Sequence, residues 1–493
     1  MIKINKNLRK SQMVLTKAFL LIKVLFLFLI LGCQTTNIPE SSSCIQPFTF
    51  NPSYWQYKNS PILLLGGSSN DNIFQNNKVE LEQELDNLIL NGGNYLRCTM
   101  SGRDKGNVYP FAFDSVSQKY NLNVFNNKYW DRLEFFLDQT FQREIIVQIE
   151  IWATYDFYTR NSLLLNGKYP WDRNPFNPVN NRNYTENESG LFSIFRSNGY
   201  EIINPFFNTP LPFPEPFDFN LEGVVLKYQK KFVDKLLSIS LNYDHVLYCI
   251  DNETQADPKW SRYWTQYIRE KALEKNKSVE ITEMWDPFDP SNGKVKGAHM
   301  QSPSTHFFTQ RSNVSVTIND PSNFSFIEIS NHNAQIGEVH YNTCRYVFNR
   351  LKDSDFVRPI NNVKIYGAGE NGWNGSYVDG QERFWRNIFA GSAAVRFHRP
   401  SAGLGHSDIA LSHIKSMRML TDSINFFSFY PSNEFITERE DNEAYGMTNL
   451  NNQYIIFFPS EGEIRLTIEK GDYSIHWLNI QSAKWESHSI MPL

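Results

Sequence analysis

The sequence predicts an α/β protein, a (β/α)8 TIM barrel with a small antiparallel β domain at its C-terminus. Strand and helix patterns alternate, giving about eight units. The strand segments are apolar throughout, as expected of a parallel sheet covered by helices. Beyond Thr437 the alternation stops and short two-residue-period strands follow. Eight units favour a closed barrel over an open doubly wound sheet, which is the alternative.

The elements follow from local spacing of apolar residues. Apolar runs bounded by Gly, Asn or Pro predict strands, in order, at 61–66, 94–97, 145–151, 245–250, 279–284, 324–330, 363–367 and 393–397. Apolar residues at helical spacing predict helices at 78–90, 130–141, 221–237, 260–274, 336–351, 381–389 and 407–424.

The stretch 155–220 is too long for an ordinary loop and is rich in aromatic residues. We expect it to wall the mouth of the barrel; the alternative is a packing insertion that touches no ligand.

The C-terminal segment reads as a separate small domain. Residues 453–458, 463–468 and 473–478 alternate at period two, and Gly462 and Gly471 lie in the turns between them. The expected division is 49–436 for the barrel and 437–493 for the β domain.

The N-terminus has the pattern of an export signal. Basic residues precede an apolar run at 24–31 that is too short to span a bilayer, and the first acidic residue is Glu40. Ile30-Leu31-Gly32-Cys33 resembles the bacterial lipobox, in which the cysteine carries the lipid. We therefore expect a lipoprotein signal at 1–32, a polar tether at 33–48 and lipidation of Cys33. This predicts a protein anchored to the bacterial cell envelope, at the outer membrane; the alternative is an ordinary signal peptide with a chance cysteine.

Charge and composition exclude several classes. The chain has 48 Lys+Arg and 52 Asp+Glu, and residues 1–32 hold six basic residues and no acids, so the processed chain has a net charge near −10. Such an acidic chain lacks the excess of basic residues with which proteins bind nucleic acid. Neither HExxH nor CxxC spacing occurs, so we expect no metal. Gly367-Ala-Gly-Glu-Asn-Gly372 matches the dinucleotide fingerprint, but Trp373-Asn-Gly follows it instead of a helix, so we expect no cofactor.

Two carboxylates follow predicted strands that are three apart in the barrel and are expected to face one cleft. The fourth strand runs into Asn252-Glu253 and the seventh into Glu370. Chemistry in this fold lies where the strands end. Glycoside hydrolysis needs two such groups. A carboxylic acid protonates the leaving oxygen, and a carboxylate attacks the anomeric carbon or activates water. Alternatively, Glu253 is a helix-start carboxylate and Glu370 a turn residue; Glu283 and Glu150 are rival carboxylates.

Further candidate substrate-binding residues lie at predicted strand ends. Asn252 is expected to bond a sugar hydroxyl, tryptophans to stack on apolar sugar faces, histidines to bond hydroxyls, and Arg97 to orient the nucleophile or to form a structural ion pair. These candidates are Arg97, Trp152, Asn252, Trp285, His332, Trp373, Arg396 and His398.

The pattern of Asn-Glu after strand four and Glu after strand seven resembles that of the cellulase-like clan of retaining (β/α)8 glycoside hydrolases. The chain is similar to its apiosidase-like lipoprotein subgroup, whose C-terminal β domain is commonly labelled "collagen-binding". That resemblance implies Glu253 as acid/base and Glu370 as nucleophile; Thr254 stands where the clan commonly has proline. The stretches that carry it are 66–71, 92–97, 251–254, 396–400, 454–459 and 473–477.

These patterns together predict a lipid-anchored glycoside hydrolase that cleaves a plant or algal polysaccharide or its oligosaccharides. The alternative is a non-catalytic glycan-binding lipoprotein on a degenerate barrel.

Overall fold

The structure is a computed structural model. It describes residues 2–6, 44–158, 163–194, 205–207, 223–254, 256, 258–285, 314–330, 335–369 and 375–492.

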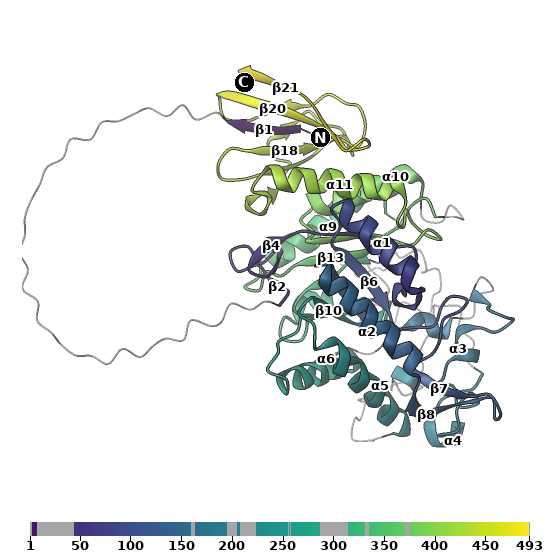
Figure 1. The fold of residues 1–493 in the computed structure, drawn as a ribbon. Helices are drawn as coiled ribbons and strands as arrows, with labels where there is room; N and C mark the ends of the chain where they lie inside the picture. The colour runs from purple at the N-terminus through teal and green to yellow at the C-terminus, as the bar shows by residue number, and fades with distance from the viewer. Residues whose placement is uncertain are drawn as a thin grey trace, which may run out of the picture.

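The centre of the molecule is a sheet of eight parallel strands that curls into a barrel (Figure 1). Ser325 N donates to Ile281 O at 2.8 Å, and Thr282 Oγ1 donates to Phe326 O at 2.7 Å, which joins the two ends of the sheet. In sheet order the strands are β11 (Ile281–Thr282), β10 (Val246–Asn252), β9 (Ile146–Ala153), β6 (Tyr95–Thr99), β5 (Leu64–Gly67), β14 (Ala394–Phe397), β13 (Ile360–Ile365) and β12 (Ile327–Glu328). The predicted (β/α)8 barrel is confirmed.

A helix follows each barrel strand and covers the outside of the sheet. In chain order these helices are α1 (Lys78–Leu90), α2 (Asn127–Gln142), α5 (Val224–Ser240), α6 (Pro258–Leu273), α8 (Val314–Asn319), α9 (Gly337–Lys352), α10 (Tyr377–Phe389) and α11 (Asp408–Ser423). Their starts follow local chemistry: the Asn77 side chain accepts from Glu80 N, and Ser376 and Asp379 form a capping box. Helix α8 was not predicted, because one short turn gives little periodic signal.

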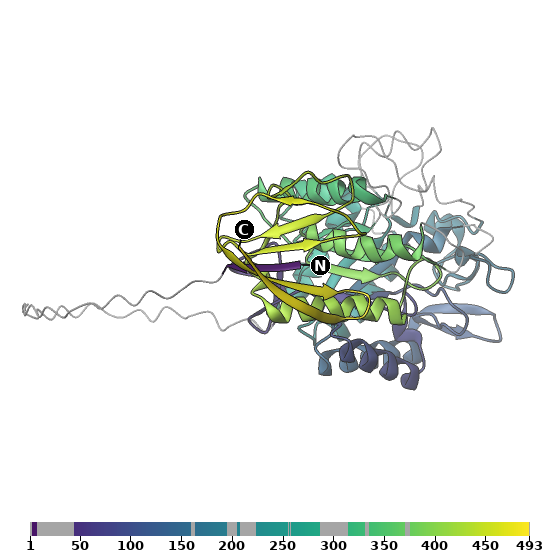
Figure 2. The ribbon, with the colours of Figure 1, turned by 90° about the horizontal axis from the view of Figure 1, so that it is seen from above.

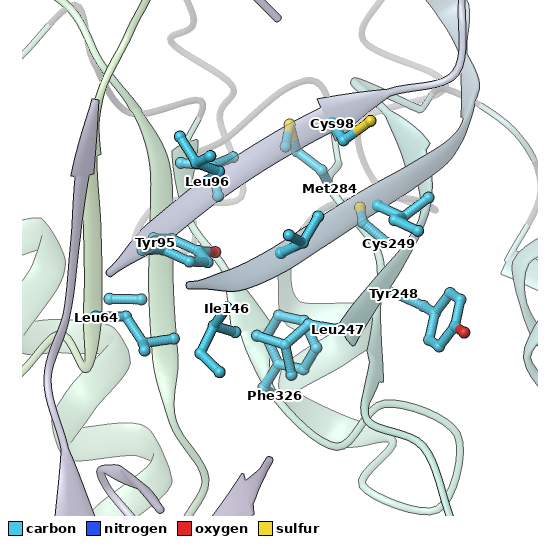
Figure 3. Close-up of a cluster of buried hydrophobic side chains, with 14 of the residues drawn as sticks. Leu64, Tyr95, Leu96, Cys98, Ile146, Leu247, Tyr248, Cys249, Met284 and Phe326 are labelled. Atoms are coloured by element: carbon cyan, nitrogen blue, oxygen red, sulfur yellow. The ribbon is translucent and has the colours of Figure 1, made fainter. Parts of the chain in front are cut away.

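The barrel core is apolar, with a buried polar layer inside it. Figure 3 shows Leu64, Ile146 and Leu247 from three strands packed together with Phe326, which directly precedes β12. Beside them Tyr95 Oη donates to Gln148 Oε1 at 2.6 Å. Asn361 Nδ2 donates to both of these oxygens at 3.2 Å, so these three polar side chains form a hydrogen-bonded group inside the barrel.

The segment predicted as the first strand is divided between two sheets. Its beginning belongs to β4 (Ser60–Ile62), which pairs with β3 (Trp55–Tyr57) and, through β3, with β2 (Gln46–Pro47). The barrel strand β5 starts only at Leu64. An apolar run in the sequence does not show where the chain leaves one sheet and enters another.

The C-terminal part forms an antiparallel sheet that lies over α10 and α11 (Figure 1). Its order is β15 (Tyr430–Pro431), β17 (Tyr445–Thr448), β18 (Tyr454–Phe457), β1 (Ile2–Lys6), β20 (Asp472–Asn479) and β21 (Lys484–Pro492), and β16 (Ile436–Thr437) pairs with β19 (Arg465–Leu466) beside it. The predicted antiparallel region is confirmed, although the sheet begins at Tyr430 and takes in the N-terminal strand β1. Figure 2 shows β1 lying along the C-terminal strands.

The C-terminal sheet packs directly on the barrel helices. Trp385 of α10 stacks on Phe457 with ring centroids 5.6 Å apart, and Tyr341 of α9 lies 4.3 Å from Tyr445. Glu338 of α9 pairs with Arg439, with Nη2 to Oε1 at 2.6 Å. Aromatic and ionic contacts thus join the two parts.

Two insertions extend the mouth of the barrel, meaning the side on which the strands end. The first is the hairpin of β7 (Phe111–Asp114) and β8 (Lys119–Phe125). The second, after β9, includes η2 (Thr154–Phe157), α3 (Pro170–Arg173), α4 (Glu186–Ser189) and η4 (Pro205–Phe207). Of its aromatic residues, Trp171, Phe176, Phe206 and Phe207 are buried, whereas Phe192 is exposed. These four rings therefore pack into the fold, as in the packing alternative.

Cys33 and the apolar run at 24–31 lie outside the described residues. Among the residues that the structure does describe, no helix combines the length and apolarity needed to cross a membrane.

Candidate active site

Glu253 stands directly after β10, at the mouth of the barrel. Its Oε1 accepts from Lys364 Nζ at 2.5 Å, and Tyr158 Oη donates to its Oε2 at 3.4 Å. Lys364 comes from β13, the seventh strand, and its side chain is 1% exposed against 14% for Glu253. The ends of strands four and seven therefore meet at this carboxylate.

The backbone of Glu253 is strained. Its φ is +65°, in the left-handed region that costs a non-glycine residue roughly 1–3 kcal/mol. On one side Asn252 ends the ladder with β9, and on the other Thr254 N donates to Met284 O at 2.8 Å. The chain turns sharply at Glu253 because Asn252 is held in the sheet and Thr254 is held by its bond to Met284. Strain of this kind is concentrated at functional sites.

The contact with Lys364 affects which protonation state Glu253 prefers. An ammonium group at hydrogen-bond distance stabilises a carboxylate over a carboxylic acid. A general acid must carry a proton, so in that role Glu253 must separate from Lys364.

Arg97 of β6 fixes the residue beside Glu253. Its Nη2 donates to Asn252 Oδ1 at 2.8 Å, its Nη1 to Asp71 Oδ1 at 2.7 Å and its Nε to Glu150 Oε1 at 2.5 Å. The guanidinium is fully buried. Arg97 thus forms a buried ion pair and at the same time orients Asn252.

Asp71, in the loop after β5, is the carboxylate on which the cations at the mouth converge. Besides Arg97, its oxygens lie 3.1 Å from Arg103 Nη1, 3.3 Å from Arg399 Nε and 3.6 Å from Arg396 Nη2. Burial alone would raise its pKa, but the Arg97 guanidinium, together with His398 and Arg399, outweighs burial and holds the pKa of Asp71 well below its usual range.

His398 and Arg396 both belong to this buried group. His398 Nδ1 lies 3.3 Å from Asp71 Oδ1, and its ring centroid is 4.7 Å from that of Tyr366. Burial lowers the pKa of His398 to about 3, so the ring is neutral at physiological pH. Arg396 Nη1 donates to Val363 O at 2.8 Å, and its Nη2 donates to Ser68 Oγ.

The two described tryptophan candidates are both buried. Trp152 packs among the rings of Phe206, Phe232 and Trp264, with centroids 5.1 to 5.6 Å away. Trp285 pairs with Thr254 in an isolated parallel bridge. In this structure both rings are covered by other residues. Stacking on a sugar would require the ring to become accessible.

The rival carboxylates are tied into the interior. Glu283 Oε1 accepts from the backbone N–H groups of Asp251 and Met284 at 2.9 Å. Burial, followed by the charge of Asp251, raises the pKa of Glu283 well above its usual value. Glu150 is occupied by Arg97 and by Thr99 Oγ1 at 3.0 Å. Glu253 is more exposed than either, which favours it as the carboxylate that meets a ligand.

Three candidate residues, Glu370, His332 and Trp373, lie outside the described residues. Strand β13 ends at Ile365, shortly before Glu370. The role predicted for Glu370 stays a prediction.

Sequence reasoning missed several residues that the structure brings to the site. The sequence could have identified Asp71 as a candidate site residue, because it ends a Gly- and Ser-rich loop directly after the first barrel strand. It could also have identified Lys364, since a lysine inside an otherwise buried strand must reach a partner or solvent. The contacts of Tyr158, Arg103 and Arg399 depend on loop paths that leave no local pattern.

Within the described ranges, no three His, Cys, Asp or Glu side chains are arranged to hold a metal ion.

Fold and site together define a (β/α)8 barrel protein with polar and charged side chains at the carboxyl ends of its strands and an antiparallel C-terminal sheet. No family model matches the chain, and no curated protein matches it. Solved structures do resemble it. A glycoside hydrolase family 5 protein from Bacteroides vulgatus superposes with a TM-score of 0.56 at 13% identity, covering 92% of this chain and 89% of the other. The endo-1,4-beta-mannanase of Rhizomucor miehei gives 0.51 at 12% identity, over 77% of this chain and 99% of its own. These likenesses establish a shared fold.

Proposed function

We propose that the chain is a glycoside hydrolase with Glu253 as its acid/base. The observation that carries the proposal is the contact of Glu253 with Lys364, because it brings the ends of strands four and seven to one point of the barrel mouth. Glycoside hydrolysis needs carboxyl groups on both sides of one bond. The structural neighbours named as a family 5 glycoside hydrolase and a mannanase support the same class.

In the proposed reaction Glu253 protonates the leaving oxygen and Glu370 attacks the anomeric carbon, so that two displacements retain the configuration. Asn252, oriented by Arg97, bonds a hydroxyl of the sugar under attack. Glu253 must release Lys364 before it can carry a proton, and Tyr158 stays within reach of its other oxygen. Substrate binding that separates the ion pair would therefore switch Glu253 towards its acid form.

The finer parts of the proposal rest on sequence patterns. Processing before Cys33 and its lipidation would anchor the enzyme to the bacterial outer membrane, as in the apiosidase-like lipoprotein subgroup that the chain resembles. Its substrate would be a plant or algal polysaccharide or its oligosaccharides.

A second candidate function is glycan binding without catalysis. The observation that favours it is again the Glu253–Lys364 ion pair, which occupies the carboxyl group that would have to act as the acid. A degenerate barrel would keep this pair in the presence of sugar.

Screening the purified protein against a panel of polysaccharides distinguishes the two functions. We expect release of new reducing ends, abolished in Glu370→Gln with the fold intact by circular dichroism. Glu144→Gln, on an exposed glutamate paired with Lys58, is the matched control and should retain full activity. Unchanged activity in Glu370→Gln contradicts the assignment of the nucleophile, and binding without cleavage by the wild type supports the second function.

A further inference from the structure

Positive charge exceeds negative charge around Asp71. Four guanidinium groups approach this carboxylate: those of Arg97, Arg103, Arg396 and Arg399. Glu150 is a second buried carboxylate of the group, and it is bound by Arg97. Among the described residues the buried part of this group therefore carries a surplus of cations.

Arg103 has donor capacity to spare. Its Nη1 faces Asp71 and its Nε donates to Ser101 Oγ at 2.8 Å, but its Nη2 has no hydrogen-bond partner in the described part of the chain. The side chain is only 5% exposed, so water offers little compensation. The guanidinium lies 4.1 Å over the ring of Tyr155, which fixes its plane. A buried, oriented and unused donor on a cation is suited to an anionic ligand.

Arg399 gives this group an opening to solvent. Its side chain is 21% exposed, and its Nε lies 3.3 Å from Asp71 without a well-directed hydrogen bond. The rim carboxylate Asp104 lies 3.9 Å from its Nη1 and is the group that an incoming anion would replace.

A fifth arginine, Arg173, faces the same region. Its Nη1 donates to Gly102 O at 3.2 Å, and its Nε and Nη2 have no partner among the described residues. Asp156 lies near both Arg103 and Arg173, and burial, against the pull of those two cations, raises its pKa to about 7. Asp156 is therefore partly neutral at physiological pH and leaves much of the arginine charge uncompensated.

Two tyrosines connect Arg103 to the candidate acid. Tyr155, under Arg103, lies in the short helix η2, and Tyr158, which reaches Glu253, directly follows that helix; their ring centroids are 6.2 Å apart. A sugar bound next to Glu253 would thus place a substituent, or its neighbouring unit, against these guanidiniums.

We propose that Arg103 and Arg399 form an anion subsite beside Glu253 that takes a sugar carrying a carboxylate or a sulfate ester. Guanidinium groups bind both anions through paired hydrogen bonds. The proposal rests on the proposed function, which it narrows to acidic glycans.

Calorimetric titration with two matched ligand pairs tests the subsite. One pair is a uronate oligosaccharide and its carboxyl-reduced form; the other is a sulfated galactan oligosaccharide and its desulfated form. We expect one charged member to bind at least about tenfold more tightly than its neutral partner, and salt to weaken that preference. The pair that shows the preference tells carboxylate from sulfate. Equal affinities within both pairs, or no binding in either, overturn the proposal.

Variants locate the effect. Arg399→Gln should remove the preference for charge, Arg399→Lys should keep part of it, and Arg103→Gln should reduce it. Arg439→Gln, on an arginine of similar exposure (18%) in the C-terminal part, is the control and should bind like the wild type. A preference that survives in Arg399→Gln and Arg103→Gln, both folded by circular dichroism, also overturns the proposal.

The two proposals can fail separately. Cleavage of neutral glycans without any preference for charge removes only the anion subsite. Tight binding of acidic glycans without hydrolysis of any polysaccharide removes only the catalytic function.

Discussion

Asp71 shows how one residue sets the electrostatics of the barrel mouth. It is fully buried, yet stays ionised because arginines and His398 surround it. The same carboxylate links loops after strands one, two and eight, through Arg103, Arg399 and His398. Removing its charge would leave several buried guanidiniums without a counterion, which is more costly than losing an exposed pair.

We therefore expect Asp71→Asn to lower the free energy of unfolding at pH 7 by about 3–5 kcal/mol in urea titrations. Because the folded-state pKa of Asp71 lies below its unfolded value, its charge contributes stability above about pH 4. The difference between wild type and variant should shrink progressively as the pH falls below that value towards the lower pKa of the folded state. Asp86→Asn, on an exposed carboxylate paired with Arg143, should cost less than about 1 kcal/mol. Equal losses in the two variants would contradict this view of Asp71.

At the scale of the elements, charged side chains on the barrel strands point into a closed interior. Glu328 of β12 accepts from Ser330 N at 2.9 Å and from Gln148 Nε2 at 3.2 Å. Burial raises its pKa to about 7, although the bonds from Ser330 and Gln148 lower it in part. The folded chain thus keeps a proton there that the unfolded chain has lost, so this group disfavours folding increasingly as the pH rises from about 4.5 to 7.

Glu328→Gln should remove this dependence. The stability of the variant relative to wild type is expected to rise between pH 4.5 and 7 by about 3 kcal/mol, measured by chemical denaturation at several pH values. Glu338→Gln is the control: Arg439 outweighs partial burial and lowers the pKa of Glu338, so its difference from wild type should stay flat over that range. A flat difference for Glu328→Gln as well would mean that this carboxyl is ionised in the folded state.

The sequence predicts the elements of the barrel better than their boundaries. Periodicity located β10, and hence the place of Glu253 after it, because burial on both faces leaves an unbroken apolar run. It could not locate the partner of Glu253, since Lys364 lies 111 residues further along and meets it only through closure of the sheet. Pairing of β1 with β18 and β20 was equally hidden, because Ile2–Lys6 reads locally as the start of an export signal.

At the scale of the whole molecule, the N-terminal strand links the proposed processing to the C-terminal sheet. Strand β1 lies between β18 and β20, with Ile4 opposite both Tyr454 and Ile475. Cleavage before Cys33 would remove this strand and leave two unpaired edges facing each other. The contacts of Trp385 with Phe457 and of Glu338 with Arg439 do not involve β1, so they would still hold the sheet to the barrel.

The central claim is that Glu253 donates a proton to the leaving group. The direct measurement compares turnover of the best polysaccharide with that of an aryl glycoside of the same sugar, whose leaving group needs no proton. For Glu253→Gln we predict a loss of about 10²–10⁴-fold on the polysaccharide and near wild-type formation of the glycosyl-enzyme from the aryl glycoside. Turnover of the polysaccharide by Glu253→Gln within a few-fold of wild type would contradict the account.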